Sequence, residues 1–206
     1  MERAVRIEQA QMLFKNNFLG VEALNRYSAE MRITVPEIVP ELPFSLSELT
    51  EKAKDYLLIL GVSQMANGAP LTLMSMREHF GIDPDIYEPC FYNQDWYMKE
   101  EFMSRQMDSK WHLIRKAIFD ESRAMQPESL LVAYTFPPAV LCAFAFFVNW
   151  FYNSECVWEH DFVWCKDVDH NNDRIYVGKY RDTNGLNKNG FSIHRHLAIK
   201  SWYGSI

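Results

Sequence analysis

The hydrophobic pattern of residues 1–44 predicts two short helices followed by an extended connection. Apolar residues recur at the spacing of one helical face between residues 2 and 15, and again between residues 20 and 32. Prolines then stand at positions 36, 40 and 43, and their fixed backbone angle and missing N–H exclude a helix interior. We therefore expect residues 1–44 to form a helical lead-in with a proline-rich connection, ahead of a main domain over residues 45–206.

The middle of the chain alternates between helical and strand-like patterns. Ser45 followed by Glu48 is a capping-box pattern that predicts the start of a helix, and the apolar run at 56–62 predicts a buried strand. A helix over residues 70–80 is expected to end at Gly81. Further on, the sequence predicts a helix over residues 96–106 capped by Asp95, with Phe102 turned inward, and a strand over residues 111–119.

The last third of the chain begins with a long apolar stretch and then becomes strand-like. Residues 136–151 open with Pro137 and Pro138, contain Asn149 and fall short of about 20 apolar residues, so a buried helix is expected and not a membrane span. Three strands separated by Asp, Asn and Gly turns follow from residue 162. The sequence thus predicts the α+β class, with a helical N-terminal region packed on a C-terminal antiparallel sheet.

Composition and charge argue against nucleic acid as a partner and favour one compartment. The chain has 21 basic and 27 acidic residues, with the basic ones scattered, so nucleic acid is not an expected partner. Its N-terminus lacks the long apolar region of an export signal, and the four cysteines have no framework spacing. We expect reduced thiols and a cytoplasmic protein, which could also be carried in a larger particle.

A polar loop that starts at Asp167 has the alternation of a calcium loop. Its candidate metal ligands are side chains two residues apart: Asp167, Asp169, Asn171 and Asp173. The loop is not an EF-hand, because Asn172 stands where that loop needs Gly and Gly178 where it needs a bidentate Glu. Asp and Asn are also common in ordinary turns, so a calcium site and a polar turn are both open interpretations.

Two further groups of residues could bind a transition metal. The alternative for the first group is a core thiol with surface histidines, and for the second it is a solvated strand face. Zinc takes sulfur and imidazole ligands, which are supplied within fifteen residues by Cys156, His160, Cys165 and His170, although the spacing matches no common zinc motif and a strand would turn Cys165 and Trp164 to opposite faces. His194 and His196 lie two apart on a predicted strand and share one face. Together with Asp167 or Asp169 they would be the centre of a metal-dependent enzyme. No nucleophile elbow, Walker loop or HExxH pattern is present.

Residues 130–200 follow a recognisable order of elements: a proline-led helix, a Trp-bearing strand and a final strand with Gly, Phe and Arg. The positions that carry this order are Pro137, Pro138, Trp164, Gly190, Phe191 and Arg195. In this order the segment resembles the C-terminal half of the C-type-lectin-like fold, as found in the formylglycine-generating-enzyme group and in the retroelement-diversified variable proteins of phages and bacteria. An RGGSW-like segment is missing, so the oxidase chemistry of the enzyme group does not carry over. The N-terminal half resembles an uncharacterised bacterial family.

This resemblance implies a scaffold that displays variable polar and aromatic side chains on its last strands and loops. The corresponding candidates for ligand binding are Tyr176, Tyr180, Asn184, Asn187, Asn189, His194, His196, Trp202 and Tyr203. We therefore expect a non-enzymatic module of bacterial or phage origin that recognises a protein or glycan ligand without a resident cofactor, apart from the open question of calcium or zinc. A metal-dependent enzyme and a structural assembly subunit are the alternatives.

Overall fold

The computed structural model describes residues 5–180, 190–195 and 203–205. The α-helices of this part are α1 (Ile7–Phe14), α2 (Val21–Arg26), α3 (Ser28–Met31), α4 (Leu46–Lys52), α5 (Leu73–Phe80), α6 (Pro127–Leu130) and α7 (Ala139–Asn153). Its short 3-10 helices are η1 (Lys15–Asn17), η2 (Glu101–Ser104) and η3 (Asp120–Ser122). Its strands are β1 (Phe18–Leu19), β2 (Tyr56–Leu60), β3 (Trp111–Arg115), β4 (Phe162–Val168), β5 (Arg174–Tyr180), β6 (Gly190–Arg195) and β7 (Tyr203–Gly204). The α+β class predicted from the sequence is confirmed.

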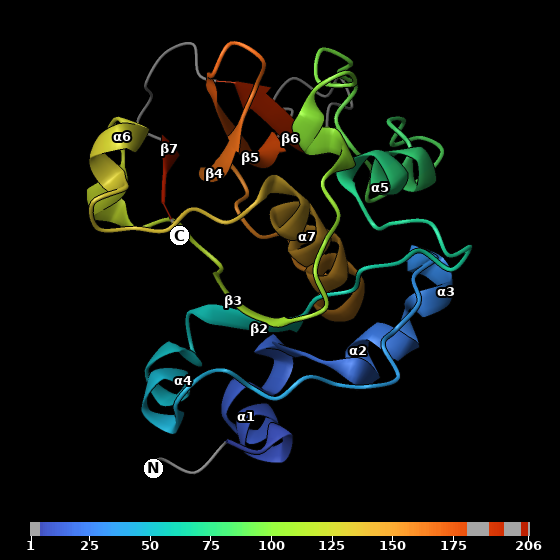
Figure 1. Cartoon of the computed structure of the whole chain (residues 1–206), viewed down its shortest axis with the longest axis vertical. Coiled ribbons are helices and arrows are strands. Elements are labelled where there is room, and N and C mark those ends of the chain that lie inside the picture. The colour runs from blue at the N-terminus through green and yellow to red at the C-terminus, as the bar shows by residue number, and fades with distance from the viewer. Residues whose placement is uncertain (1–4, 181–189, 196–202, 206) are drawn as a thin grey trace.

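The first sheet has three strands in the order β1-β2-β3 and holds the N-terminal helices to the rest of the protein. Strand β2 pairs in parallel with β1 and antiparallel with β3, so that Leu58 lies between Phe18 and Leu113. Residues 57–60 are all fully buried, which explains why the strand reads as an unbroken apolar run. Figure 1 shows α1, α2 and α4 on one side of this sheet and α7 on the other.

Several helix ends lie where the capping residues predicted them. The Ser45 side chain accepts a hydrogen bond from the Glu48 N–H at 3.1 Å, and α4 begins at the next residue. Helix α5 ends at Gly81, whose φ of 69° is readily available only to glycine. The helix predicted after Asp95 is wrong. That segment forms turns and the short helix η2, although Phe102 is buried as expected.

The second sheet has four strands in the order β6-β5-β4-β7 and is covered on one face by α7. The β4-β5 and β5-β6 pairs are antiparallel, as the meander pattern predicted, whereas β7 joins β4 in parallel. Helix α7 begins directly after Pro138, and its first eleven residues are buried. It lies between the two sheets in Figure 1, and this position accounts for a helix that is apolar on nearly every face.

The opposite face of the second sheet carries a smaller aromatic cluster. Trp164, Phe162 and Tyr176 pack there with Leu130 and Phe136. Cys165, the neighbour of Trp164, instead joins the main core together with α7, as strand alternation predicts. The sheet is therefore buried on both faces, and little of its described central area is available as a flat binding surface.

The main hydrophobic core runs through the predicted division of the chain at residues 44 and 45. Leu19 and Leu24 from the first part belong to the same cluster as Leu58 and Phe144 from the second. The four cysteines are free thiols, and three of them are buried. Among the described residues, no helix combines the length and the apolar character that a membrane crossing requires.

Candidate functional site

The loop between β4 and β5 is built around the side chain of Asp169. Its Oδ1 accepts hydrogen bonds from the backbone N–H groups of Asn171 (2.9 Å) and Asp173 (2.8 Å). Two backbone hydrogen bonds between residues 169 and 172–173 close the turn, and Asn172 adopts a φ of 67°, which asparagine tolerates better than most residues. These contacts are those of an aspartate-closed turn, which explains the density of Asp and Asn in the sequence.

The other aspartate at this end of β4 points toward helix α7. Asp167 is 1 % exposed at its side chain, where it pairs with the guanidinium of Arg105 and accepts the backbone N–H of Ala139 at 2.7 Å. Ala139 is the first residue of α7, so its N–H has no partner within the helix. The carboxylate thus caps the helix, ties η2 to β4, and lies at the helix end where negative charge is favourable.

A third carboxylate reaches the turn from the N-terminal side of η2. Glu100 is 9 % exposed and binds one residue of the turn twice, because His170 donates its backbone N–H to Oε2 at 2.9 Å and places Nδ1 2.6 Å from Oε1. The imidazole itself remains 66 % exposed. Seventy residues separate the two partners in the sequence, so this contact joins two distant segments of the chain.

Arg195 at the end of β6 completes the arrangement. Its guanidinium lies 3.2 Å from Oδ2 of Asp169, whose side chain is fully buried, and stacks 5.2 Å from the ring centre of Trp96. The Trp96 indole N–H in turn donates to the backbone carbonyl of Ile193 at 3.2 Å. Burial opposes ionisation of Asp169, but hydrogen bonds from the turn and from Arg195 outweigh it and hold the pKa of that carboxyl below its ordinary value.

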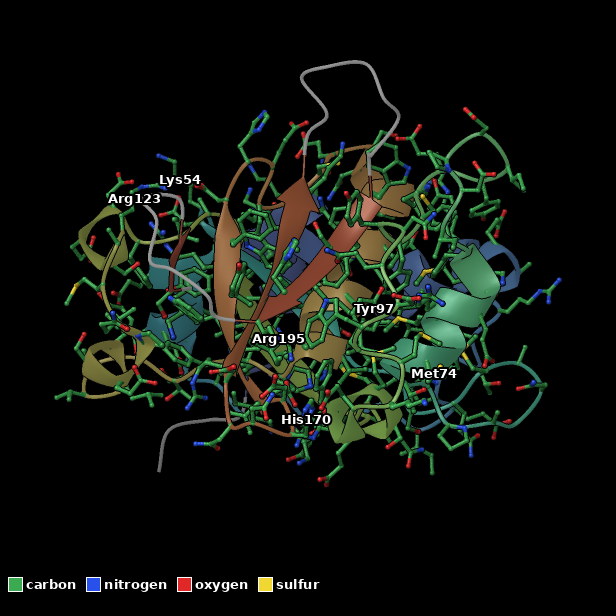
Figure 2. The ribbon with its side chains drawn as sticks, turned by 90° about the horizontal axis from the view of Figure 1, so that it is seen from above. Lys54, Met74, Tyr97, Arg123, His170 and Arg195 are labelled. Carbon is green, nitrogen blue, oxygen red and sulfur yellow. The ribbon has the colours of Figure 1, made fainter. Side chains whose placement is uncertain are left out.

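Six charged or titratable residues therefore meet where the β4-β5 turn, η2, β6 and the start of α7 come together. This group, here named the tip cluster, consists of Glu100, Arg105, Asp167, Asp169, His170 and Arg195. Figure 2 shows His170 and Arg195 on the same side of the molecule, away from Arg123 and Lys54. Three carboxylates face two guanidinium groups, so the tip cluster carries a charge of −1 when the imidazole is neutral.

The four residues of the predicted calcium loop are separated by these contacts. Asp167 faces Arg105 and α7, while Asp169 faces the turn backbone and Arg195. Asn171 is exposed and Asp173 half-buried. Among the described residues, the only group of three potential metal ligands within 4.8 Å of one another is Glu100, Asp169 and His170. Calcium binding by the loop stays a prediction.

The proposed sulfur and imidazole ligands for zinc are not brought together. Cys165 is fully buried against α7, where desolvation raises the pKa of its thiol well above the ordinary value, whereas His170 is at the surface beyond the end of β4. Cys156 is half-buried with the ammonium of Lys179 3.2 Å from its sulfur. Cys165 points into the core from β4, whereas Cys156, His160 and His170 lie outside that strand. The described structure therefore does not bring the four candidate zinc ligands together.

The predicted pairing of His194 with Asp167 or Asp169 is also wrong. His194 lies on the face of the second sheet that carries the aromatic cluster, with its ring stacked on Tyr176 at 5.3 Å. Its neighbour Arg195 points to the α7 side, where it meets Asp169. Because successive strand residues alternate between the two faces, the imidazole and the carboxylates lie on opposite sides of the sheet.

The predicted ligand-binding residues have different outcomes. Tyr176 is 6 % exposed and packs in the aromatic cluster, so its ring is not displayed, because the sheet is covered on this face too. His194 is half-buried beside it. Asn184, Asn187, Asn189, His196 and Trp202 lie outside the described residues, as do the side chains of Tyr180 and Tyr203.

The half-buried ring of His194 makes the stability of the protein sensitive to acid. Burial lowers the pKa of this histidine from 6.5 to about 4, and its Nε2 has no hydrogen-bond partner within the described part of the chain. The unfolded chain takes up a proton below about pH 6.5, while the folded one does so only near pH 4. Stability is therefore lost as the pH falls between these values, by roughly 3 kcal/mol in total.

The variant His194→Phe should remove this acid sensitivity, since a phenyl ring has no proton to gain. We expect urea unfolding at pH 7, 5.5 and 4.5 to show a loss of stability in the wild type that is roughly 2 to 3 kcal/mol larger than in the variant. His160→Asn, a change at an exposed histidine, is the control and should follow the wild type. Parallel curves for wild type and His194→Phe would contradict this assignment.

Glu100, Arg105 and Trp96 were not predicted as site residues. Their partners on β4, the β4-β5 turn and β6 lie more than sixty residues away along the chain, and no local pattern marks such a contact. The one signal in the sequence is the concentration of Asp and Asn residues from Asp167 onward. It indicates a turn closed by polar side chains, but it does not indicate which segment packs against that turn.

The chain was compared with known proteins at three levels. No family model, no curated protein and no solved structure matches it.

Proposed function

We propose that this protein is a recognition module, of bacterial or phage origin and without catalytic activity, that binds a protein or glycan ligand. The surface at the tip cluster is its binding site. The fold resemblance expected from the C-terminal strands, a C-type-lectin-like scaffold, is part of this proposal and favours the same class of function.

One observation carries the proposal. Arg105 and Arg195 are 40 % and 37 % exposed at their side chains, yet each is held by a carboxylate that is almost completely buried. Guanidinium groups held in this way offer their remaining N–H donors to a ligand without the entropy loss of ordering a long side chain. The adjoining turn adds exposed polar groups from residues 170–172.

The composition of this surface is typical of binding sites. Arginine and tryptophan are enriched among the residues that contribute most to binding energy, and Trp96 is held under Arg195 by its own hydrogen bond. Asparagine supplies adaptable hydrogen bonds. In contrast, the titratable groups of the tip cluster are paired with one another, which suits a rigid support better than proton transfer.

A binding screen tests the proposal. Wild-type protein is applied to a glycan array and to a tiled array of unstructured peptides, and each positive signal is repeated with the variant His170→Ala, Asn171→Ala, Asn172→Gly. All three positions are exposed, and glycine accepts the positive φ of residue 172. We expect at least about a tenfold loss of affinity, because three polar contacts leave the centre of the surface.

A second variant supplies the matched control. Glu37, Ile38 and Glu41 are exposed on the proline-rich connection, and their replacement by alanine should leave binding unchanged. Equal loss in both variants, or binding that survives the change at the turn, would contradict the assignment. If binding is lost only in Tyr180→Ala or Trp202→Ala, the binding surface is formed by the other predicted residues and not by the tip cluster.

A further inference from the structure

The tip cluster has more acceptor capacity than its described partners use. A carboxylate offers about four lone-pair positions. Three positions of Asp169 are taken by two backbone N–H groups and Arg195, while Glu100 uses two for His170. Unused acceptor positions on two buried carboxylates, within a group whose charge is −1, point to a cationic ligand.

Three potential metal ligands of the tip cluster lie close together in space, although they are not all close in sequence. One ligand atom each from Glu100, Asp169 and His170 lies within 4.8 Å of the other two. Around a tetrahedral zinc ion with bonds near 2.1 Å, ligand atoms are roughly 3.4 Å apart. The 2.6 Å between His170 Nδ1 and Glu100 Oε1 must therefore widen, which a small rotation of the exposed imidazole allows. Glu100 is held by the backbone N–H of His170, and Asp169 is held by the turn backbone and by Arg195.

We propose that Glu100, Asp169 and His170 form a binding site for one zinc ion. Two carboxylate oxygens and one imidazole nitrogen suit zinc, whereas calcium and magnesium prefer oxygen alone. The exposure of His170 leaves the outer side of the ion open to water or to a ligand group. This arrangement of three protein ligands and one open position is independent of the proposed recognition function, because the ion binds whether or not a partner exists.

The site differs in two ways from the group of cysteines and histidines considered from the sequence. It contains no thiolate, and Glu100 comes from a segment that is far away in sequence. The neighbouring guanidinium group of Arg195 also affects the affinity of the site for zinc. Arg195 competes for Asp169, so zinc must share that carboxylate with a guanidinium group. We therefore expect micromolar and not picomolar affinity, since part of the binding energy is offset by this competition.

Isothermal titration with zinc chloride tests the proposal on protein first treated with chelator and then freed of it. We expect one ion per chain at pH 7.5. Glu100→Gln and His170→Asn should each weaken binding by more than the roughly 10- to 100-fold that loss of an outer-sphere partner costs. Both variants should remain folded by circular dichroism, because each substitution keeps a polar side chain of similar size.

Matched controls separate this site from adventitious binding. His160→Asn removes another exposed histidine at a positive φ that asparagine accepts, and Cys156→Ser removes the one half-buried thiol. Both should bind zinc as the wild type does. Cobalt should bind without the intense near-ultraviolet absorption of a cobalt–thiolate bond, because the site contains no cysteine.

Three results would overturn the proposal. The first is zinc affinity weaker than about 1 mM, which leaves less than about 4 kcal/mol for binding. The second is binding that persists in Glu100→Gln and His170→Asn but is lost in a control variant. The third is saturable binding of calcium without zinc, which would favour the aspartate loop instead.

Discussion

Replacing Asp167 by alanine is expected to lower the free energy of unfolding by about 3 kcal/mol. The buried carboxylate accepts the backbone N–H of Ala139 and pairs with Arg105. Alanine leaves that N–H buried without its partner, at a cost of roughly 1 to 3 kcal/mol, and removes a charge-assisted hydrogen bond as well. Arg105 is partly exposed and regains water, which limits the loss. Urea unfolding at pH 7 measures the difference.

Two companion variants show which contact matters. Asp167→Asn keeps an oxygen for the Ala139 N–H but loses the charge, so it should retain roughly half of the stability that alanine loses. Asp173→Ala changes a half-buried aspartate of the adjoining β4-β5 turn and should cost less than about 1 kcal/mol. If Asp167→Ala unfolds at the same urea concentration as the wild type, the carboxylate does not support α7.

Replacing Phe147 by alanine is expected to lower the free energy of unfolding by about 4 kcal/mol. Its ring is fully buried on α7 and stacks on Phe80 at 4.0 Å with an interplanar angle of 6°, and Phe91 lies 5.2 Å away. Large-to-small changes of this kind cost roughly 3 to 5 kcal/mol, from lost burial and from the cavity left behind. Thermal and urea unfolding should both detect it, because the loss is a large part of an ordinary domain's stability.

Conservative and surface changes calibrate this effect. Phe147→Leu keeps most of the volume and should cost less than half as much as alanine. Ile38→Ala, at a side chain that is 88 % exposed, should stay within about 0.5 kcal/mol of the wild type. An alanine variant as stable as the leucine variant would mean that α7 does not form the centre of the core.

The structural roles of Phe147 and Asp167 differ in how well the sequence predicts them. Phe147 belongs to an apolar helix led by Pro137 and Pro138, which periodicity and length predict directly. The role of Asp167 was not predicted, because the same Asp and Asn spacing is compatible with a metal loop and with a turn. Only the position of Ala139 and Arg105 shows why this carboxylate is buried.

Local sequence patterns predicted helix ends correctly where a single residue determines the backbone conformation. Ser45 starts α4 and Gly81 ends α5, because capping bonds and positive φ act over a few residues. The segment after Asp95 has a helical pattern but forms only η2, since Trp96 and Glu100 make their contacts with β6 and the β4-β5 turn instead. Tertiary contacts there outweigh helix propensity, which is a small energy per residue.

The sequence by itself determined the α+β class, the buried helix α7, the antiparallel meander and the alternation that separates Trp164 from Cys165. These features depend on periodicity and on short-range capping, which neighbouring residues encode. Only the tertiary structure decided which carboxylates meet which cations at the tip cluster, and that Tyr176 and His194 face a covered side of the sheet. Arg105 and Asp167 are 62 residues apart and Glu100 and His170 are 70 apart, while Arg195 and Asp169 lie on different elements 26 residues apart. Electrostatic pairing between such segments follows from how the elements pack and not from the order of residues in either one.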